Sequence, residues 1–114
     1  MRQAKAAQAL VLQAEAVIVS PASLCEVVWV LSRAYRRENA EIHHAVRLLL
    51  NVGNIVTDRQ AVEAGLAVLQ AGGDFADGVI AQSGEALGAA SFASFDRDAV
   101  KVLKQLGKQA FVPV

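Results

Sequence analysis

The chain has 114 residues, which suits a single domain that buries about two-thirds of its unfolded surface. Eleven basic and eleven acidic residues cancel, so any binding of nucleic acid must come from a local basic patch. Hydrophobic residues make up 54% of the sequence and there is one cysteine, which argues against disorder and excludes an internal disulfide. No apolar run reaches the ~18 residues of a membrane span, so we expect no membrane partner and a cytoplasmic location.

The apolar residues change their period several times along the chain. Residues 2–14 are rich in Ala, Gln and Leu and indicate a helix, and the β-branched run 16–20 indicates a strand. Ser20 followed by Pro21 is typical of a helix start. The remaining predicted elements are, in order, a helix over 39–51, a strand over 54–57, a helix over 59–71 capped by Asp58, a helix from 74, a strand over 90–95, a helix over 97–106 and a strand over 109–114. This alternation predicts one α/β domain, over residues 1–114, with a parallel sheet covered on both faces.

Several carboxylates follow the predicted strands or begin the predicted helices. They are Glu26, Asp74, Asp77, Asp96 and Asp98. Because parallel strands end at the same edge of a sheet, we expect these side chains to converge there. Mg²⁺ and Mn²⁺ prefer oxygen ligands, and they can activate water and stabilise charge on a phosphoryl oxygen. The pattern therefore favours metal-dependent hydrolysis of a phosphodiester.

Each of these carboxylates also has a structural explanation. Glu26 lies on a helix that is apolar nearly all round, so we expect it to be partly buried and paired with an arginine, a helix N-terminus or a metal. Asp74 follows two glycines and fits a helix N-cap, while Asp77 in the first turn can interact with the helix dipole. Either Asp96 or Asp98 can cap the helix that follows. The pattern alone leaves these alternatives open.

Aromatic and basic residues on the helix after Pro21 are further candidates. Arg33, Arg36 and Arg37 can bind RNA phosphates or the acidic part of a protein partner, although cations are favoured at a helix end in any case. Trp29 lies within the apolar start of its helix, so we expect it in the core or in an interface rather than as a platform for stacking bases.

Three segments, taken together, carry a family resemblance: "SPASLCEVVWVLSRAY", "DFADGVIA" and "SFDRDAV". In this order and spacing they resemble PIN-domain ribonucleases, and most of all the toxins of bacterial VapBC toxin–antitoxin modules. The resemblance covers nearly the whole chain and implies a three-layer α/β/α fold with a parallel sheet. It also implies RNA cleavage with Mg²⁺ or Mn²⁺, an antitoxin partner and a homodimer or higher oligomer. The implied catalytic metal ligands are Glu26, Asp77 and Asp96, supported by Asp74 and Asp98.

The chain departs from that family at its start. PIN domains usually begin with a strand ending in Asp-x-Asn, whose Asp is a central metal ligand, whereas no Asp precedes Asp58 here. Ser94 also stands where Thr is common. The absent strand normally lies mid-sheet, so we expect a gap with unpaired strand edges between 16–20 and 90–95, left by truncation or filled by another segment or subunit.

Two other functions are compatible with parts of the pattern. One is a catalytically impaired PIN remnant that acts as an oligomerising or antitoxin-binding module, which the missing first strand would explain. The other is a flavodoxin-like receiver with an acidic Mg²⁺ pocket. A receiver needs an acidic pair after its first strand and a Lys after its last full strand, and neither is in place. We therefore rank the receiver below both PIN readings.

Overall fold

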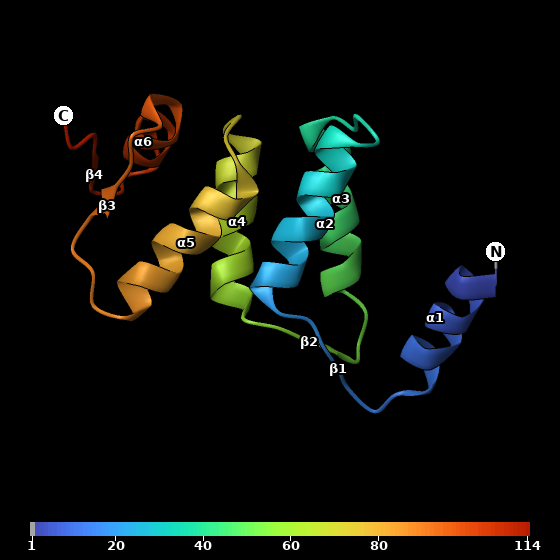
Figure 1. Cartoon of the computed structure of the whole chain (residues 1–114). Coiled ribbons are helices and arrows are strands. Elements are labelled where there is room, and N and C mark those ends of the chain that lie inside the picture. Colours follow the sequence, from blue (N-terminus) through green and yellow to red (C-terminus); the bar gives the residue numbers. More distant parts are fainter. Residues whose placement is uncertain (1) are drawn as a thin grey trace.

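The computed structural model describes residues 2–114, which form six helices and four short strands (Figure 1). The helices are α1 (Arg2–Gln13), α2 (Pro21–Arg33), α3 (Asn39–Leu50), α4 (Arg59–Gln70), α5 (Phe75–Ala86) and α6 (Arg97–Gln105). The strands are β1 (Val17–Ile18), β2 (Ile55–Val56), β3 (Phe92–Ala93) and β4 (Ala110–Phe111). The order of helices and strands along the chain matches the sequence prediction, although every strand is shorter than predicted.

The strands form two separate parallel pairs. Strand β1 pairs with β2, and β3 pairs with β4. The N–H groups of Val17 and Val19 donate to carbonyls on the β2 side. Because these groups alternate along a strand, the N–H of Ile18 faces the opposite edge. The predicted parallel pairing is confirmed, whereas the three-layer arrangement and the gap expected between β1 and β3 stay predictions.

Local signals in the sequence set the ends of several helices as predicted. The Ser20 hydroxyl accepts a hydrogen bond from the N–H of Ser23, and Pro21 occupies the first turn of α2. The Asp58 carboxylate accepts from the N–H of Ala61 at the start of α4. Gly72 ends that helix with a φ of 94°, a conformation that side chains with a Cβ rarely adopt. These ends place the loops that carry the candidate site.

The buried side chains form two clusters that share α4 and α5. The larger cluster joins α2, α3, α4 and α5, and Phe75, Leu24 and Ile42 are almost fully buried in it. The smaller one joins α4 and α5 to α6 and β4. Helix α4 therefore contributes buried residues to both clusters and links the two ends of the molecule.

Helix α1 lies at one end of an elongated molecule (Figure 1). The Cα radius of gyration is 15.4 Å and the principal extents are 50 × 31 × 18 Å, compared with about 13 Å for a compact domain of this length. Helix α1 buries none of its residues. The side-chain amide of Asn54 donates to the carbonyls of Val11 and Ala14, which ties the end of α1 to the start of β2.

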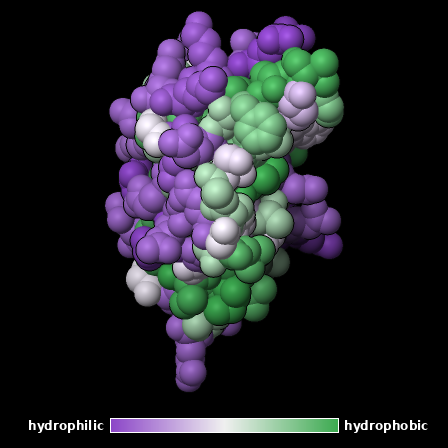
Figure 2. Space-filling model, turned by 90° about the vertical axis from the view of Figure 1, so that its left-hand side faces the viewer, coloured by the Kyte–Doolittle hydropathy of each residue, from purple (hydrophilic) through white to green (hydrophobic). Residues whose placement is uncertain are grey.

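The surface at the opposite end is divided by polarity. Figure 2 shows that face, with apolar atoms gathered along one side and hydrophilic atoms along the other. Exposed apolar residues in this part of the chain include Ile80, Phe95 and Phe111. None of the helices within residues 2–114 combines the length and the apolar character needed to cross a membrane.

Candidate functional site

The start of α5 is fixed by unusually close packing against α4. A Cβ added to Gly78 would lie 2.3 Å from the carbonyl oxygen of Ala64, and one added to Gly65 would lie 2.7 Å from the Phe75 ring. Glycine is therefore required at both positions for the two helices to approach this closely. This contact holds the first turn of α5, and with it Asp77, in a defined position.

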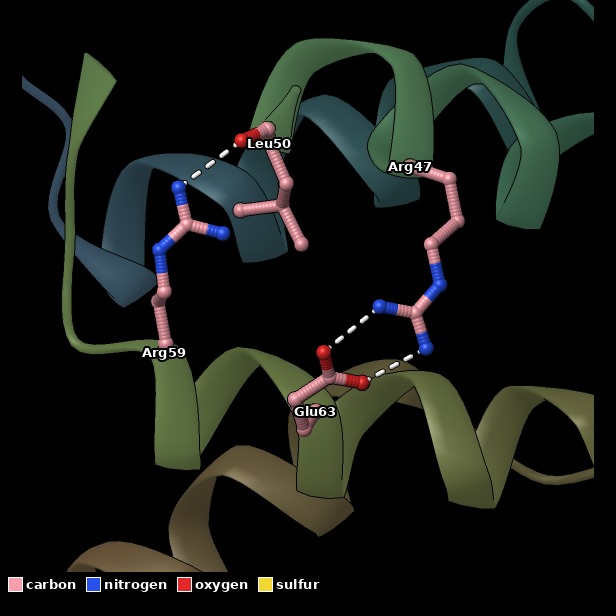
Figure 3. A network of polar contacts seen from close by, with 4 residues as sticks. All are labelled: Arg47, Leu50, Arg59 and Glu63. Atoms are coloured by element: carbon pink, nitrogen blue, oxygen red, sulfur yellow. Dashed lines mark hydrogen bonds and ion pairs between the residues drawn. The ribbon is translucent and has the colours of Figure 1, made fainter. Parts of the chain in front are cut away.

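Helix α4 is in turn held against α3 by polar contacts. The Arg47 guanidinium donates two hydrogen bonds to the Glu63 carboxylate, of 2.5 and 2.6 Å, and Arg59 donates to the carbonyl of Leu50 at 2.8 Å (Figure 3). The Arg47 side chain lowers the pKa of Glu63, chiefly through these hydrogen bonds. The scaffold behind the site is thus fixed by an ion pair as well as by apolar packing.

Asp77 is half-buried in the first turn of α5, and its pKa is raised. Burial is the main cause, followed by the negative charges of Asp74 and Asp96. Asp96 lies after β3, far along the chain from α5, so the negative charges that act on Asp77 come from two segments. Within residues 2–114, the structure does not place three of the predicted carboxylates as one group of metal ligands.

Asp96 is held in place by its own local hydrogen bonds. Its Oδ1 accepts from the N–H groups of Asp98 and Ala99, at 3.0 and 3.2 Å, and thereby caps α6. The Ser94 hydroxyl accepts from the N–H of Asp96 at 3.0 Å. Asp96, rather than Asp98, is therefore the cap, and its Oδ2 remains for a ligand. The contribution of Ser94 was missed from the sequence, although its spacing two residues before Asp96 is the available signal.

Asp74 differs from the sequence prediction in one respect. It occupies the N-cap position of α5, but its side chain makes no capping hydrogen bond. The carboxylate is exposed and its charge contributes, after burial, to the raised pKa of the Cys25 thiol on α2. Helix capping therefore does not account for the carboxylate of Asp74, which lies between α2 and Asp77.

One prediction about α2 is wrong. Glu26 is exposed rather than partly buried, and it is not among the charges that raise the pKa of Asp77. Trp29 is 60% exposed, which excludes the core and leaves the interface as the remaining expectation for it. The start of the helix is apolar nearly all round, but only the side carrying Leu24 and Val28 is covered by neighbouring elements. Periodicity shows the faces of a helix and not which face is covered.

The basic residues after Trp29 are all exposed. Arg33 is in the last turn of α2, and Arg36 has a φ of 52°, in the left-handed region. Arg37 pairs with Glu41 at 3.6 Å. A small hollow of about 80 Å³ is lined by Trp29 and Arg33 of α2 and by Asp74 at the start of α5. The basic end of α2 is thus continuous with the carboxylate of Asp74.

The carboxylates are the right kind of ligand for a divalent cation, but fewer of them are grouped in the described part of the chain than a site made of protein side chains alone would need. Their oxygens are the ligands that Mg²⁺ and Mn²⁺ prefer, and a cation would offset the repulsion that raises the pKa of Asp77. Within residues 2–114, however, no group of three or more His, Cys, Asp or Glu side chains is placed to hold a metal ion. Mg²⁺ is often bound by only one or two carboxylates, with water and substrate phosphate completing its shell.

A second hollow lies outside this site. It has a volume of about 500 Å³ and is formed by α4, α5 and α6, with apolar side chains such as Val68 and Leu103 and the charged groups of Arg59 and Lys108. None of the five predicted carboxylates lines it. The larger hollow is therefore separate from the predicted acidic residues, of which Asp74 lines the smaller hollow beside α2.

Comparison with known proteins gives one family match. A family model described as PIN domain matches residues 2–105. The matched range runs from α1 to the end of α6 and includes all five predicted carboxylates. No curated protein and no solved structure gives a significant match.

Proposed function

The chain belongs to the PIN domain family, and on that premise we propose that it is a metal-dependent endoribonuclease similar to the toxins of VapBC modules. Membership of this family generally implies nuclease activity on RNA. The observation that carries the proposal is the PIN domain match over residues 2–105, a range in which Asp77 is half-buried and subject to the negative charges of Asp74 and Asp96. These residues come from two segments, and no capping role explains Asp74 or Asp77.

In this proposal Asp77 and Asp96 hold Mg²⁺ or Mn²⁺, supported by Asp74. The bound ion would supply an activated water and offset the charge that builds on the phosphoryl oxygens. The protein's own residues fix the ligands: the hydrogen bonds at the start of α6 orient Asp96. The contact at Gly78 positions the turn that carries Asp77.

Two further ligands and the partners enter the proposal through the family resemblance. Glu26 lies on α2, which packs against α5, and Asp98 follows Asp96 by two residues. The resemblance also supports an RNA substrate, a cognate antitoxin and a homodimer or higher oligomer as partners. Asp77 is the residue whose role in the proposal draws support from both its half-buried position and the resemblance.

RNA cleavage by the wild type and by Asp77→Asn, with Mg²⁺ and with Mn²⁺, tests the proposal. We expect the variant to lose about 100-fold or more of the activity, as when an electrostatic group of an active site is removed. Glu85→Gln is the matched control, because Glu85 is on the same helix and pairs with Lys108 at 3.0 Å, outside the acidic group. Equal rates for the wild type and Asp77→Asn would contradict the role of Asp77.

The second candidate function is a catalytically impaired module that oligomerises or binds an antitoxin. It is favoured by the observation that residues 2–114 hold no group of three or more ligands placed for a metal. Isothermal titration calorimetry of the folded protein with Mn²⁺ distinguishes the nuclease from the non-catalytic module. Binding at millimolar or lower concentration that Asp77→Asn weakens supports the nuclease. No binding at millimolar concentration supports the non-catalytic module.

A further inference from the structure

Trp29 is an exposed indole beside the acidic group. It is the only tryptophan of the chain, and 60% of its surface is accessible on α2. An aromatic side chain of this size usually finds a packing partner, because its burial stabilises a protein more than that of most residues. The larger core cluster includes Leu24 and Val28 of the same helix but not Trp29. The indole is therefore free to contact a ligand.

The neighbours of Trp29 combine an aromatic surface with a positive charge. Trp29 and Arg33 are four residues apart and therefore adjacent on one face of α2. They line the hollow that Asp74 closes from the side of α5. Arg33 makes no ion pair with any residue in the range 2–114. An indole, a guanidinium without an ion pair and the carboxylate of Asp74 thus border one hollow.

We propose that Trp29 and Arg33 form a subsite for single-stranded RNA, in which an unpaired base stacks on the indole and the guanidinium binds a phosphate. The proposal rests on the proposed nuclease function, because that function makes RNA the ligand that reaches Asp74 and Asp77. Aromatic side chains stack on bases of any sequence, and arginine contributes both charge and a planar surface. Bases in a duplex are already stacked on one another, so the subsite selects single strands.

The subsite would also offset the electrostatic repulsion between RNA and the acidic residues. The chain has no net charge, and RNA phosphates are repelled by the acidic group. Arg33 with the exposed Arg36 gives one end of α2 a local positive charge, while stacking on Trp29 adds affinity that does not depend on charge. Binding would therefore begin at α2 and present the backbone to the carboxylates.

The single tryptophan makes the test direct. The fluorescence of Trp29 is followed while a single-stranded oligoribonucleotide of about ten nucleotides is added at low salt with EDTA, which prevents cleavage. The same titration is run with a duplex of the same sequence. We expect the single strand to quench the emission and the duplex to bind more weakly. Unchanged emission at all RNA concentrations would overturn the proposal.

Variants measure the contribution of each group with a labelled oligoribonucleotide. Trp29→Leu keeps an apolar side chain but removes the stacking surface, and we expect a loss of affinity on the order of 5- to 150-fold. Arg33→Gln should weaken binding and lower the salt dependence by about one phosphate contact. Phe111→Leu is the matched control, because Phe111 is a 47% exposed aromatic residue on β4. Its affinity should equal that of the wild type.

The outcomes separate this subsite from the proposed activity. If Trp29→Leu binds RNA like the wild type while Asp77→Asn abolishes cleavage, the nuclease stands and the subsite is wrong. If the wild type cleaves nothing but Trp29→Leu loses RNA affinity, the subsite stands without the activity. If Trp29→Leu changes only the oligomeric state, measured by light scattering, Trp29 belongs to an interface between copies and the subsite is again wrong.

Discussion

Helices α1 and α4 have nearly the same sequence and very different surroundings. Each has twelve residues, "RQAKAAQALVLQ" and "RQAVEAGLAVLQ", and the two are identical at seven aligned positions. Helix α4 buries six residues, whereas α1 buries none. In Figure 1, α4 lies at the centre of the molecule and α1 at its edge. Composition and helix propensity therefore do not decide which of these helices enters the core.

The five differing positions explain the contrast. Where α4 has Val62 and Gly65, both buried, α1 has Lys5 and Gln8. A charge and an amide at these positions would be costly to bury. Gly65 additionally admits the ring of Phe75 from α5, and no residue with a side chain could do so. Burial thus depends on a few positions that match one partner helix.

The largest expected effect comes from truncating one leucine in each of the two helices. Leu66 in α4 is 1% exposed and Leu12 in α1 is 83% exposed. We expect Leu66→Ala to lower the free energy of unfolding by about 2–5 kcal/mol, and Leu12→Ala to change it by less than about 0.5 kcal/mol. Urea unfolding followed by circular dichroism measures both.

Of these two variants, Leu12→Ala tests whether α1 is exposed in solution. A loss for Leu12→Ala close to that for Leu66→Ala would show that the apolar side of α1 is covered in solution. Repeating the measurement at several protein concentrations then identifies a second copy as the cover, because stability that depends on association rises with concentration.

A smaller effect is expected from alanine substitutions at two glycines of α5. At Gly78 the new Cβ would meet backbone atoms of α4 at 2.3 Å, so the helices must separate. We expect Gly78→Ala to cost about 1–3 kcal/mol of stability. At Gly84 the nearest atom is the Cβ of Ala89 at 3.6 Å, an ordinary contact. Gly84→Ala should therefore stabilise the protein by up to about 1 kcal/mol through helix propensity.

These two glycines also test how the site depends on the α4–α5 contact. Since Asp77 directly precedes Gly78, separating the helices should disturb the proposed RNA cleavage in Gly78→Ala but not in Gly84→Ala. Thermal unfolding of both variants, with cleavage measured well below their melting temperatures, keeps the two effects apart. Equal stability of the two variants would mean that α4 and α5 are less tightly packed than the structure shows.

Much of the fold could be predicted because its signals are local. Ser20, Asp58 and Gly72 begin or end helices through bonds and backbone angles within a few residues. The parallel pairing followed from the alternation of helices and strands. A gap between the strands over 16–20 and 90–95 was expected, but the sequence did not predict that each strand has only two residues or that the pairs are β1–β2 and β3–β4. Sheet order depends on contacts between distant segments, which a single sequence does not encode in any short pattern.

In the candidate site, too, features set by local signals were predictable and features set by contacts between distant segments were not. The convergence of the carboxylates at one edge of the sheet stays a prediction, and the negative charge of Asp96 that acts on Asp77 is compatible with it. The burial of Glu26 was predicted wrongly, because the apolar turns around it suggested a cover that residues 2–114 do not provide. The exposure of Trp29 excludes the core for this residue and leaves the interface that the sequence also allowed. Periodicity identifies faces, and only tertiary contacts decide which of them are covered.

The smallest expected effect concerns the ion pair that holds α4 to α3 and has no counterpart in α1, where Ala6 stands at the position of Glu63. Arg47 lowers the pKa of Glu63 below its ordinary value of 4.5. A carboxyl group with a lowered folded pKa stabilises the protein above its unfolded pKa, and this contribution is lost as the pH falls through the folded value. The side chains are 42% and 48% exposed, so solvent screening limits the pair to about 1 kcal/mol or less.

Glu63→Gln should therefore be less stable than the wild type at pH 7, and the difference should shrink as the pH falls below about 4.5. Urea unfolding of both proteins from pH 7 down to about pH 2, at low and high salt, follows this difference through the range in which it should be lost. Glu15→Gln is the control, because Glu15 makes no ion pair within residues 2–114. A difference that persisted unchanged at low pH would mean that Glu63 stabilises α4 through packing rather than charge. Since Glu63 and Val62 are neighbours that α1 replaces with Ala6 and Lys5, that result would assign the contrast between the helices wholly to apolar contacts.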